Sequence, residues 1–215
     1  MERSGPGNVR KAQSRRMAKV TELEILNNLL AAAYVATLKM RPMTGMYEDG
    51  VLVSYWRNQP EARAAFFSET VVTPDSHAAW IAAKSPYKQV WMVENQYDKP
   101  VGTAALYIDP VARTAEAGPL LVAPECRGKG YAREIDYMML AMAFEFFQLD
   151  SVWGEAFVSN AAILHLHESV GFRLTTTREH PRGLVQRIEY YRQTWDKRRV
   201  EYAAMGRTLL PGWTP

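Results

Sequence analysis

The feature that most constrains the fold of this chain is the junction at residues 120–132, where a strand pattern passes through a glycine-containing loop into a helix pattern. Three β-favouring residues at 120–122 precede a turn marked by Pro124, then Gly128 and Gly130, then an apolar segment at 131–147. A turn of this kind exposes consecutive backbone N–H groups at the positive end of a helix, which favours an anion. Because glycine has no Cβ, the backbone can approach a phosphate closely. The junction therefore predicts a phosphate-binding turn.

This loop differs from the two best-known phosphate-binding motifs. It lacks the Gly-x-x-x-x-Gly-Lys-Ser/Thr pattern of P-loop proteins and the Gly-x-Gly-x-x-Gly pattern of dinucleotide-binding domains. Arg127 and Lys129 place two cations beside the loop, and the small Ala132 keeps the first helical turn open. These neighbours favour an anionic ligand, whereas Gly-x-Gly alone is equally typical of a purely structural helix start.

The rest of the chain alternates between strand and helix patterns. The expected strands are 36–40, 89–94, 101–108, 116–122, 151–157, 172–176 and 185–191, and the expected helices are 47–57, 74–84, 131–147, 161–170 and 194–204. A further helix is expected to begin at the capping box of Thr21 and Glu24. A strand meander followed by alternating helices and strands predicts an α/β fold, a mixed sheet with helices on both faces. Residues 20–204 are expected to form one domain, followed by a tail at 205–215.

Charge is distributed unevenly along the chain. The net charge is +3, but residues 1–20 hold six basic groups and one acid, so the remaining chain carries a net charge of −2. Residues 1–19 are expected to form a flexible basic arm, read most simply as a solvated extension, or as an upstream start with Met17 as the alternative. A transit peptide or a phosphate-binding tail would have a similar composition.

Composition excludes several classes of protein. With 47% hydrophobic residues the chain is not disordered, and the apolar stretch at 20–38 contains too many polar residues to span a membrane. The lone cysteine, Cys126, excludes a disulfide framework and a Cys-based zinc site, so no metal is expected and a cytoplasmic location is predicted.

At this loop the sequence resembles the GNAT superfamily of acyl-CoA-dependent N-acyltransferases. The family signature Arg/Gln-x-x-Gly-x-Gly/Ala is matched by Arg127, Gly130 and Ala132. A second block at 160–172 is similar to the family pattern Asn-x-x-Ala-x-x-Leu-Tyr-Glu-Lys-x-Gly-Phe. The agreeing positions are Asn160, Leu166, Glu168, Gly171 and Phe172. The resemblance spans roughly residues 36–191 and implies the GNAT fold, a mixed and mostly antiparallel central sheet.

The resemblance also implies acetyl-CoA as co-substrate. In the family the loop amides hold the pyrophosphate of coenzyme A, and the preceding strand pairs with the pantetheine arm. The residues implied in this sequence are Leu120, Leu121, Val122, Arg127, Gly128, Lys129, Gly130, Tyr131 and Ala132. Asn160 is expected to bind the pantetheine or to cap the helix that begins at 161.

Direct acetylation of an amine needs a neutral nitrogen and a proton for the leaving thiolate. His167 stands where the family often has a tyrosine general acid, so it is a candidate acid, with water as the alternative proton source. His165 points to a different helix face and is expected at the surface. Glu116 is the candidate base and Glu155 its rival, although either can be a salt-bridged carboxylate. Cys126 is not expected to form an acyl-enzyme, because the family transfers the acetyl group directly.

The segment at 54–81 bears on the acceptor. Its Trp-Arg-Asn-x-Pro-Glu-x-Arg block and later His-x-x-Trp spacing are similar to two GNAT subgroups, one acting on nucleotide-activated amino sugars and one on protein N-termini, as ribosomal-protein acetyltransferases do. The Phe-Phe-Ser segment and the spacing of His77 and Trp80 are closer to the sugar subgroup, so a nucleotide-linked amino sugar is the predicted acceptor. Stacking is expected from Trp56, Phe66, Phe67 and Trp80, and phosphate contacts from Arg57 and Arg63. Aromatics at helical spacing are more often core residues of amphipathic helices, and that interpretation stays open here.

Other functions stay open at this level. A non-catalytic acyl-CoA-binding protein would keep the loop but lose acid–base groups. An acetyltransferase for a modified nucleic-acid amine would explain the basic arm. A homodimer is compatible with the sequence.

Overall fold

The computed structural model describes residues 33–35, 38–83, 85 and 87–204. All of these residues belong to one compact unit that begins at Ala33. The predicted basic arm, the helix expected from Thr21 and the tail at 205–215 lie outside the described residues. The boundaries proposed for the single domain therefore stay predictions.

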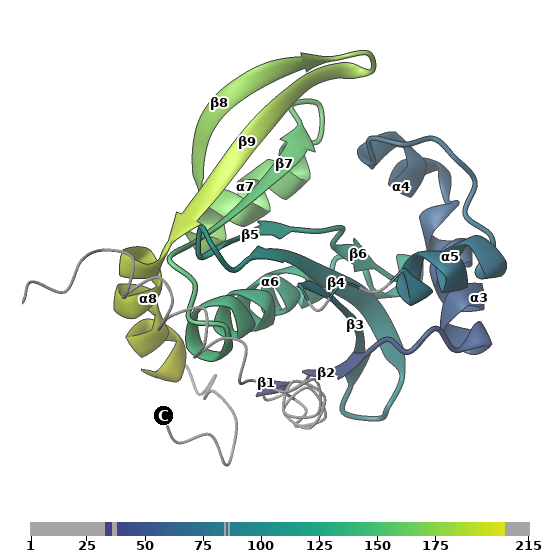
Figure 1. Cartoon of the computed structure of the whole chain (residues 1–215), viewed down its shortest axis with the longest axis horizontal. Helices are drawn as coiled ribbons and strands as arrows, with labels where there is room; N and C mark the ends of the chain where they lie inside the picture. Colours follow the sequence, from purple (N-terminus) through teal and green to yellow (C-terminus); the bar gives the residue numbers. More distant parts are fainter. Residues whose placement is uncertain (1–32, 36–37, 84, 86, 205–215) are drawn as a thin grey trace, which may run out of the picture. The chain divides into compact units, whose positions relative to one another are not determined.

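Nine strands of the described residues form one sheet (Figure 1). They are β1 (Ala33–Val35), β2 (Leu38–Pro42), β3 (Lys88–Asn95), β4 (Pro100–Asp109), β5 (Thr114–Ala117), β6 (Leu121–Val122), β7 (Ser151–Phe157), β8 (Arg173–His180) and β9 (Gly183–Tyr191). Their order is β1-β2-β3-β4-β5-β7-β9-β8, and β6 also pairs with β4. The β5–β7 pair is parallel and the other pairs are antiparallel. This arrangement confirms the predicted mixed, mostly antiparallel sheet.

Helices lie on both faces of this sheet. They are α3 (Tyr47–Arg57), α4 (Pro60–Ala65), α5 (Pro74–Ala82), the 3-10 turn η1 (Pro124–Cys126), α6 (Tyr131–Ala141), the π-helical η2 (Met142–Phe146), α7 (Ala161–Val170) and α8 (Arg192–Ala204). A Cβ added to Gly102 of β4 would lie 3.0 Å from Ile135 of α6, so this side of β4 faces α6. Since side chains alternate along a strand, the neighbouring Thr103 points to the opposite face, toward α3 and α5. None of the described helices is long and apolar enough to cross a membrane.

The predicted strand at 116–122 is divided in the structure. β5 ends at Ala117 and β6 begins at Leu121. Pro119 in the interruption has no backbone N–H to donate to a ladder. Gly118 approaches β4 so closely that a Cβ there would lie 2.8 Å from the Ala105 Cβ. The division lets β5 continue beside β7 while β6 stays with β4.

Other differences from the expected elements have local causes. The predicted helix at 131–147 is α6 followed by the π-helical η2. The sequence around Pro60 reads as a helix stop, but Pro60 also begins the short helix α4 at its first position, where its missing N–H costs nothing. The helix expected from Thr73 ends at Ala82, and Thr73 forms a reciprocal capping box with Ser76.

A cluster of buried apolar side chains fixes α3, α4 and α5 against the sheet. Its members are Met43, Val53, Trp56, Ala62, Ile81, Met92, Leu121 and Ala123. Figure 1 shows these three helices gathered beside β4 and β6. Full burial of a large apolar side chain contributes roughly 1.5–3 kcal/mol. This packing therefore holds the helices rigidly over the point where β5 and β6 separate.

Candidate active site

The sheet opens where β5 and β6 separate. β5 pairs with β7 through Ala115 and Val152, whereas β6 pairs with β4 through Leu121 and Thr103. Within the described residues β6 has no pairing with β7. One backbone edge of β6 therefore faces an opening. An extended amide chain can bind such an edge by adding its own N–H and C=O groups to it.

The loop after β6 has the backbone geometry that an anion site needs. Gly128 and Gly130 have φ values of +73° and +85°, in the left-handed region that glycine adopts readily. A Cβ at either position would meet nothing within 4 Å, so the space beside the loop is open. Gly130 is the N-cap of α6, and the first amides of a helix have no intrahelical acceptors. Loop and helix start together form an open cradle of donors.

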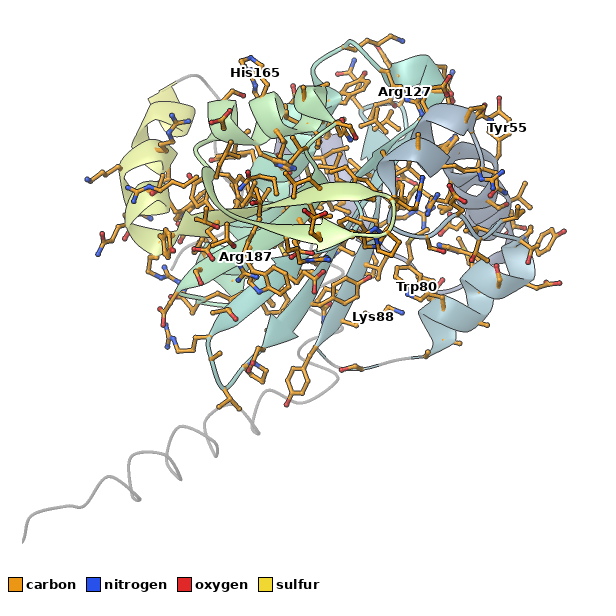
Figure 2. All side chains as sticks on the ribbon, turned by 90° about the horizontal axis from the view of Figure 1, so that it is seen from above. Tyr55, Trp80, Lys88, Arg127, His165 and Arg187 are labelled. Atoms are coloured by element: carbon orange, nitrogen blue, oxygen red, sulfur yellow. The ribbon has the colours of Figure 1, made fainter. Side chains whose placement is uncertain are left out.

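Two predicted cations flank this cradle. Lys129 Nζ donates to the backbone oxygen of Glu125 at 2.8 Å, so it folds back over η1. Arg127 is 3.7 Å from the carboxylate of Glu61 in α4 and lies on the surface (Figure 2). Together, the donor cradle, the cations and the free edge of β6 fit a pyrophosphate joined to an amide-containing arm, as in coenzyme A.

A cavity of about 330 Å³ lies beside the opening. Its lining includes Arg57 of α3, His77 and Trp80 of α5, Thr103 and Tyr107 of β4, and Leu121 of β6. Because Leu121 belongs both to this lining and to the free strand edge, the cavity and the opening adjoin. Most other lining residues are apolar, and no carboxylate is found among the described residues that line the cavity.

Arg57 is buried at the helical end of this cavity, with 8% of its surface exposed. Its Nη2 donates to the backbone oxygen of Ser68 at 2.8 Å, and its guanidinium carbon lies 3.6 Å from the centre of the Phe66 ring. Burial lowers the pKa of Arg57, and the charges of Arg182 and Arg63 lower it further. Nη1 is buried and has no hydrogen-bond partner among the described residues.

His77 and Trp80 line the cavity from α5. The two rings are 5.6 Å apart, and the Lys88 ammonium lies 3.8 Å from the centre of the Trp80 ring (Figure 2). His77 is 7% exposed, and its Nδ1 has no hydrogen-bond partner in the described part of the chain. Burial lowers the pKa of His77, outweighing the opposite effect of Asp49.

Two other aromatic residues considered for the acceptor, Trp56 and Phe67, do not line the cavity. Trp56 is 1% exposed in the core cluster and does not line the cavity. Phe67 packs on Phe157 at 4.9 Å between ring centres, and its neighbour Phe66 lines the cavity instead. The structure therefore does not bring Trp56 and Phe67 to the cavity, and a contact of either residue with the acceptor stays a prediction.

The two candidate bases differ in their surroundings. Glu116 of β5 pairs with Tyr107 of β4, so both side chains share one face of the sheet. Burial raises the pKa of Glu116, and the nearby charge of Glu155 raises it further. Glu155 instead accepts a hydrogen bond from Arg178 Nε at 3.0 Å, and this pairing lowers its pKa. Burial and the charge of Glu116 raise the pKa of Tyr107 to about 12.

Tyr107 is a cavity-lining residue that sequence reasoning missed, as are Ser76 and Thr103. It lines the cavity, whereas Glu116 beside it does not. The available signal was the alternation of β4, since Thr103, Ala105 and Tyr107 must share a face.

The candidate acid lies between α6 and α7. His167 is buried, and its Nδ1 is 2.7 Å from the carboxylate of Asp136, which is fully buried. Its ring packs on Phe172 at 5.0 Å between ring centres, and His167 does not line the cavity.

Two other residues named from the sequence lie at or near α7. His165 projects into solvent (Figure 2), and Asn160 caps α7 by accepting a hydrogen bond from the Ile163 amide at 3.4 Å. In the described residues His, Cys, Asp and Glu form no cluster that could hold a metal ion.

Comparison with known proteins agrees with this architecture. A family model described as an acetyltransferase (GNAT) domain matches residues 37–173. No curated protein sequence matches the chain. The spermidine N-acetyltransferase of Vibrio cholerae, solved with CoA and spermine, superposes with a TM-score of 0.67 at 22% identity, covering 74% of this chain and 97% of that one. A spermidine/spermine N-acetyltransferase structure from the same organism, solved with manganese ions, has a TM-score of 0.62 at 22% identity over 76% of this chain and 97% of that one.

At this level of identity the solved structures establish the fold, and the family model establishes the membership. Its match covers well over half of the chain and includes the loop, the cavity strands and α7. The chain belongs to the GNAT acetyltransferases and is an N-acetyltransferase that uses acetyl-CoA as co-substrate.

Proposed function

We propose that this enzyme acetylates the primary amine of a small acceptor that is not a polycation, with a nucleotide-linked amino sugar as the first class to test. The observation that carries the proposal is the lining of the cavity, in which Arg57 is present and no carboxylate is found among the described residues. A buried cationic ligand needs compensating negative charge. The lining therefore disfavours spermidine, the substrate for which the two compared enzymes are named.

Acetyl-CoA is proposed to bind along the opening of the sheet. The amides of Gly128, Lys129, Gly130, Tyr131 and Ala132 would hold its pyrophosphate at the start of α6, with Arg127 adding charge. The free edge of β6, with Leu120 leading into it, would bind the pantetheine amides. The support is the open space beside both glycines and the unpaired edge in the described sheet.

Proton transfer is proposed to involve Glu116. The acceptor nitrogen attacks the thioester carbonyl carbon, the carbon–sulfur bond breaks, and the thiolate leaves. Glu116 receives the proton lost by the amine, through water beside Tyr107, because it shares a sheet face with this cavity-lining residue. Its raised pKa makes it a better base near neutral pH than an ordinary carboxylate. The thiolate takes a proton from His167 or from water.

A thiol-release assay tests the proposal on the full-length protein. Acetyl-CoA is supplied with a nucleotide-linked amino sugar carrying a free amine, with spermidine, with a peptide bearing a free N-terminus, or with RNA. We expect kcat/KM to be at least about tenfold higher for the amino-sugar nucleotide than for spermidine. Preference for spermidine would overturn the proposal. Activity confined to the peptide or the RNA would assign the enzyme to those alternatives, and acetyl-CoA binding without thiol release would indicate a non-catalytic protein.

A further inference from the structure

We propose that Arg57 and His77 form an oxyanion subsite at the helical end of the cavity, which binds a carboxylate or phosphate group of the acceptor. This inference rests on the proposed function, because it takes the cavity to hold the amine acceptor. It goes beyond that function by assigning the recognition of a second chemical group to two named side chains.

One nitrogen of the Arg57 guanidinium is held in place by a hydrogen bond, and another has no hydrogen-bond partner among the described residues. Ser68 holds Nη2 through its backbone oxygen, and the Phe66 ring supports the guanidinium plane. Nη1 is sealed from solvent without a hydrogen-bond partner among the described residues, although Arg57 lines the cavity. Buried polar atoms in folded proteins are almost always paired, so an orphaned charged donor in a cavity wall indicates an acceptor supplied by a ligand.

The electrostatic surroundings make that acceptor an anion. Arg182 and Arg63 lie close enough to Arg57 to disfavour its charge. The carboxylate of Glu69 is 3.1 Å from Arg182, whereas no ion pair to Arg57 is present in the described residues. A ligand oxyanion would neutralise this excess of positive charge, and a guanidinium binds carboxylate and phosphate oxygens particularly well.

His77 supplies the second orphaned atom of the same cavity. It is buried on α5, lines the cavity, and its Nδ1 has no hydrogen-bond partner in the described part of the chain. The lowered pKa favours the neutral ring near pH 7, and a neutral imidazole carries one N–H donor and one acceptor nitrogen. His77 can therefore donate to an anionic oxygen or accept from an adjacent hydroxyl.

The positions of Arg57 and His77 define the orientation in which the acceptor binds. Arg57 and His77 lie on helices α3 and α5, while Leu121 lines the cavity from the strand whose free edge borders the opening. The reacting amine must lie toward Leu121, where the acetyl group would arrive. The structure thus calls for a bifunctional acceptor with an amine at one end and an oxyanion at the other. Amino acids and phosphorylated or nucleotide-linked amino sugars share this chemistry.

The test uses acceptors in matched pairs. One pair is glucosamine 1-phosphate with glucosamine, and the other is an amino acid with the amine left by its decarboxylation. For full-length enzyme we expect kcat/KM to be about 10- to 100-fold higher for the oxyanion-bearing member of one pair. The responding pair distinguishes phosphate from carboxylate. Equal values within both pairs would overturn the subsite.

Variants locate the effect. Arg57→Met should remove most of that preference, mainly by raising KM for the oxyanion-bearing member more than for its neutral partner. His77→Phe should lower kcat/KM for the oxyanion member about 3- to 10-fold. Arg113→Met is the matched control, because Arg113 pairs with Asp150 outside the cavity lining, and should keep the preference.

Two controls separate the possible failures. Melting temperatures and acetyl-CoA affinities show whether each variant is folded. In a folded Arg57→Met variant, an equal loss for both members of a pair would overturn the subsite. Absence of transfer to any amine by the unmodified enzyme would overturn the proposed function as a whole, whereas efficient transfer to neutral amines alone would overturn only the subsite.

Discussion

Tyr107 and Glu116 lie directly opposite one another on the antiparallel strands β4 and β5, with both side chains on the face that carries the cavity. The phenol lines the cavity and the carboxylate adjoins it. Burial raises the pKa of Tyr107, and the nearby charge of Glu116 raises it further. This pairing places the candidate base next to a residue that lines the cavity.

The pH dependence of the enzyme should follow the charges around Glu116. The charge of Glu155 raises the pKa of Glu116, and that of Arg187 lowers it. Because the deprotonated form is the base, Glu155→Gln should move the acidic limb of the kcat/KM profile to lower pH. Arg187→Gln should move it to higher pH. If the acidic limb stays at the same pH in both variants as in the unmodified enzyme, Glu116 is not the base.

Loss of the Glu116 carboxylate should act on the chemical step. Glu116→Gln is expected to lower kcat about 10²- to 10⁴-fold, the usual contribution of a positioned base. Acetyl-CoA affinity, measured by calorimetry, should be unchanged. Glu179→Gln is the control, since Glu179 is exposed on strand β8 and lies outside the cavity lining. A Glu116→Gln enzyme with normal kcat would contradict the assignment.

The left-handed conformation of Gly130 should matter for acetyl-CoA binding. A Cβ at this φ of +85° strains the backbone by about 1–2 kcal/mol. Gly130→Ala should therefore raise KM for acetyl-CoA at least about fivefold, as the amides at the start of α6 move. Gly183→Ala, at a φ of +134° at the start of β9, should reduce stability without changing that KM. If both variants bind acetyl-CoA normally, the loop does not hold the pyrophosphate.

The buried pair of His167 and Asp136 should make a measurable contribution to stability. His167→Leu leaves the fully buried Asp136 without its partner, and such a loss typically costs about 3–5 kcal/mol. The double variant His167→Leu/Asp136→Leu should recover most of this free energy of unfolding in a denaturant titration. Its kcat then reports on chemistry alone: a large decrease would identify His167 as the proton donor, and an unchanged value would assign that role to water. Additive losses in the double variant would contradict the pairing.

Local features of the chain were predictable because they depend on neighbouring residues. The expected helices at 47–57 and 161–170 and the expected strand at 151–157 coincide with α3, α7 and β7. Caps such as Thr73 and Asn160 act within three residues, so their effect can be read from the sequence. The positive φ angles of Gly128 and Gly130 likewise follow from the loop itself.

Which side chains form the cavity depended on packing between distant segments. Trp56 and Arg57 are adjacent on α3, yet Trp56 is in the core and Arg57 lines the cavity, because successive helical residues point about 100° apart. Phe66 and Phe67 divide in the same way between the cavity and a contact with Phe157. The two adjacent phenylalanines in particular offer no local signal to distinguish them.

The sequence by itself determined the family, through the motifs at residues 120–132 and 160–172, and most helices and strands, through short-range patterns along the chain. It also predicted a phosphate-binding turn at residues 127–132. Only the tertiary structure decided where the sheet opens, that Tyr107 stands beside Glu116, and that Arg57 and His77 share one cavity. These relations join residues from different strands and helices. Their distances are set by the packing of the whole sheet against α3 and α5, which no local pattern encodes.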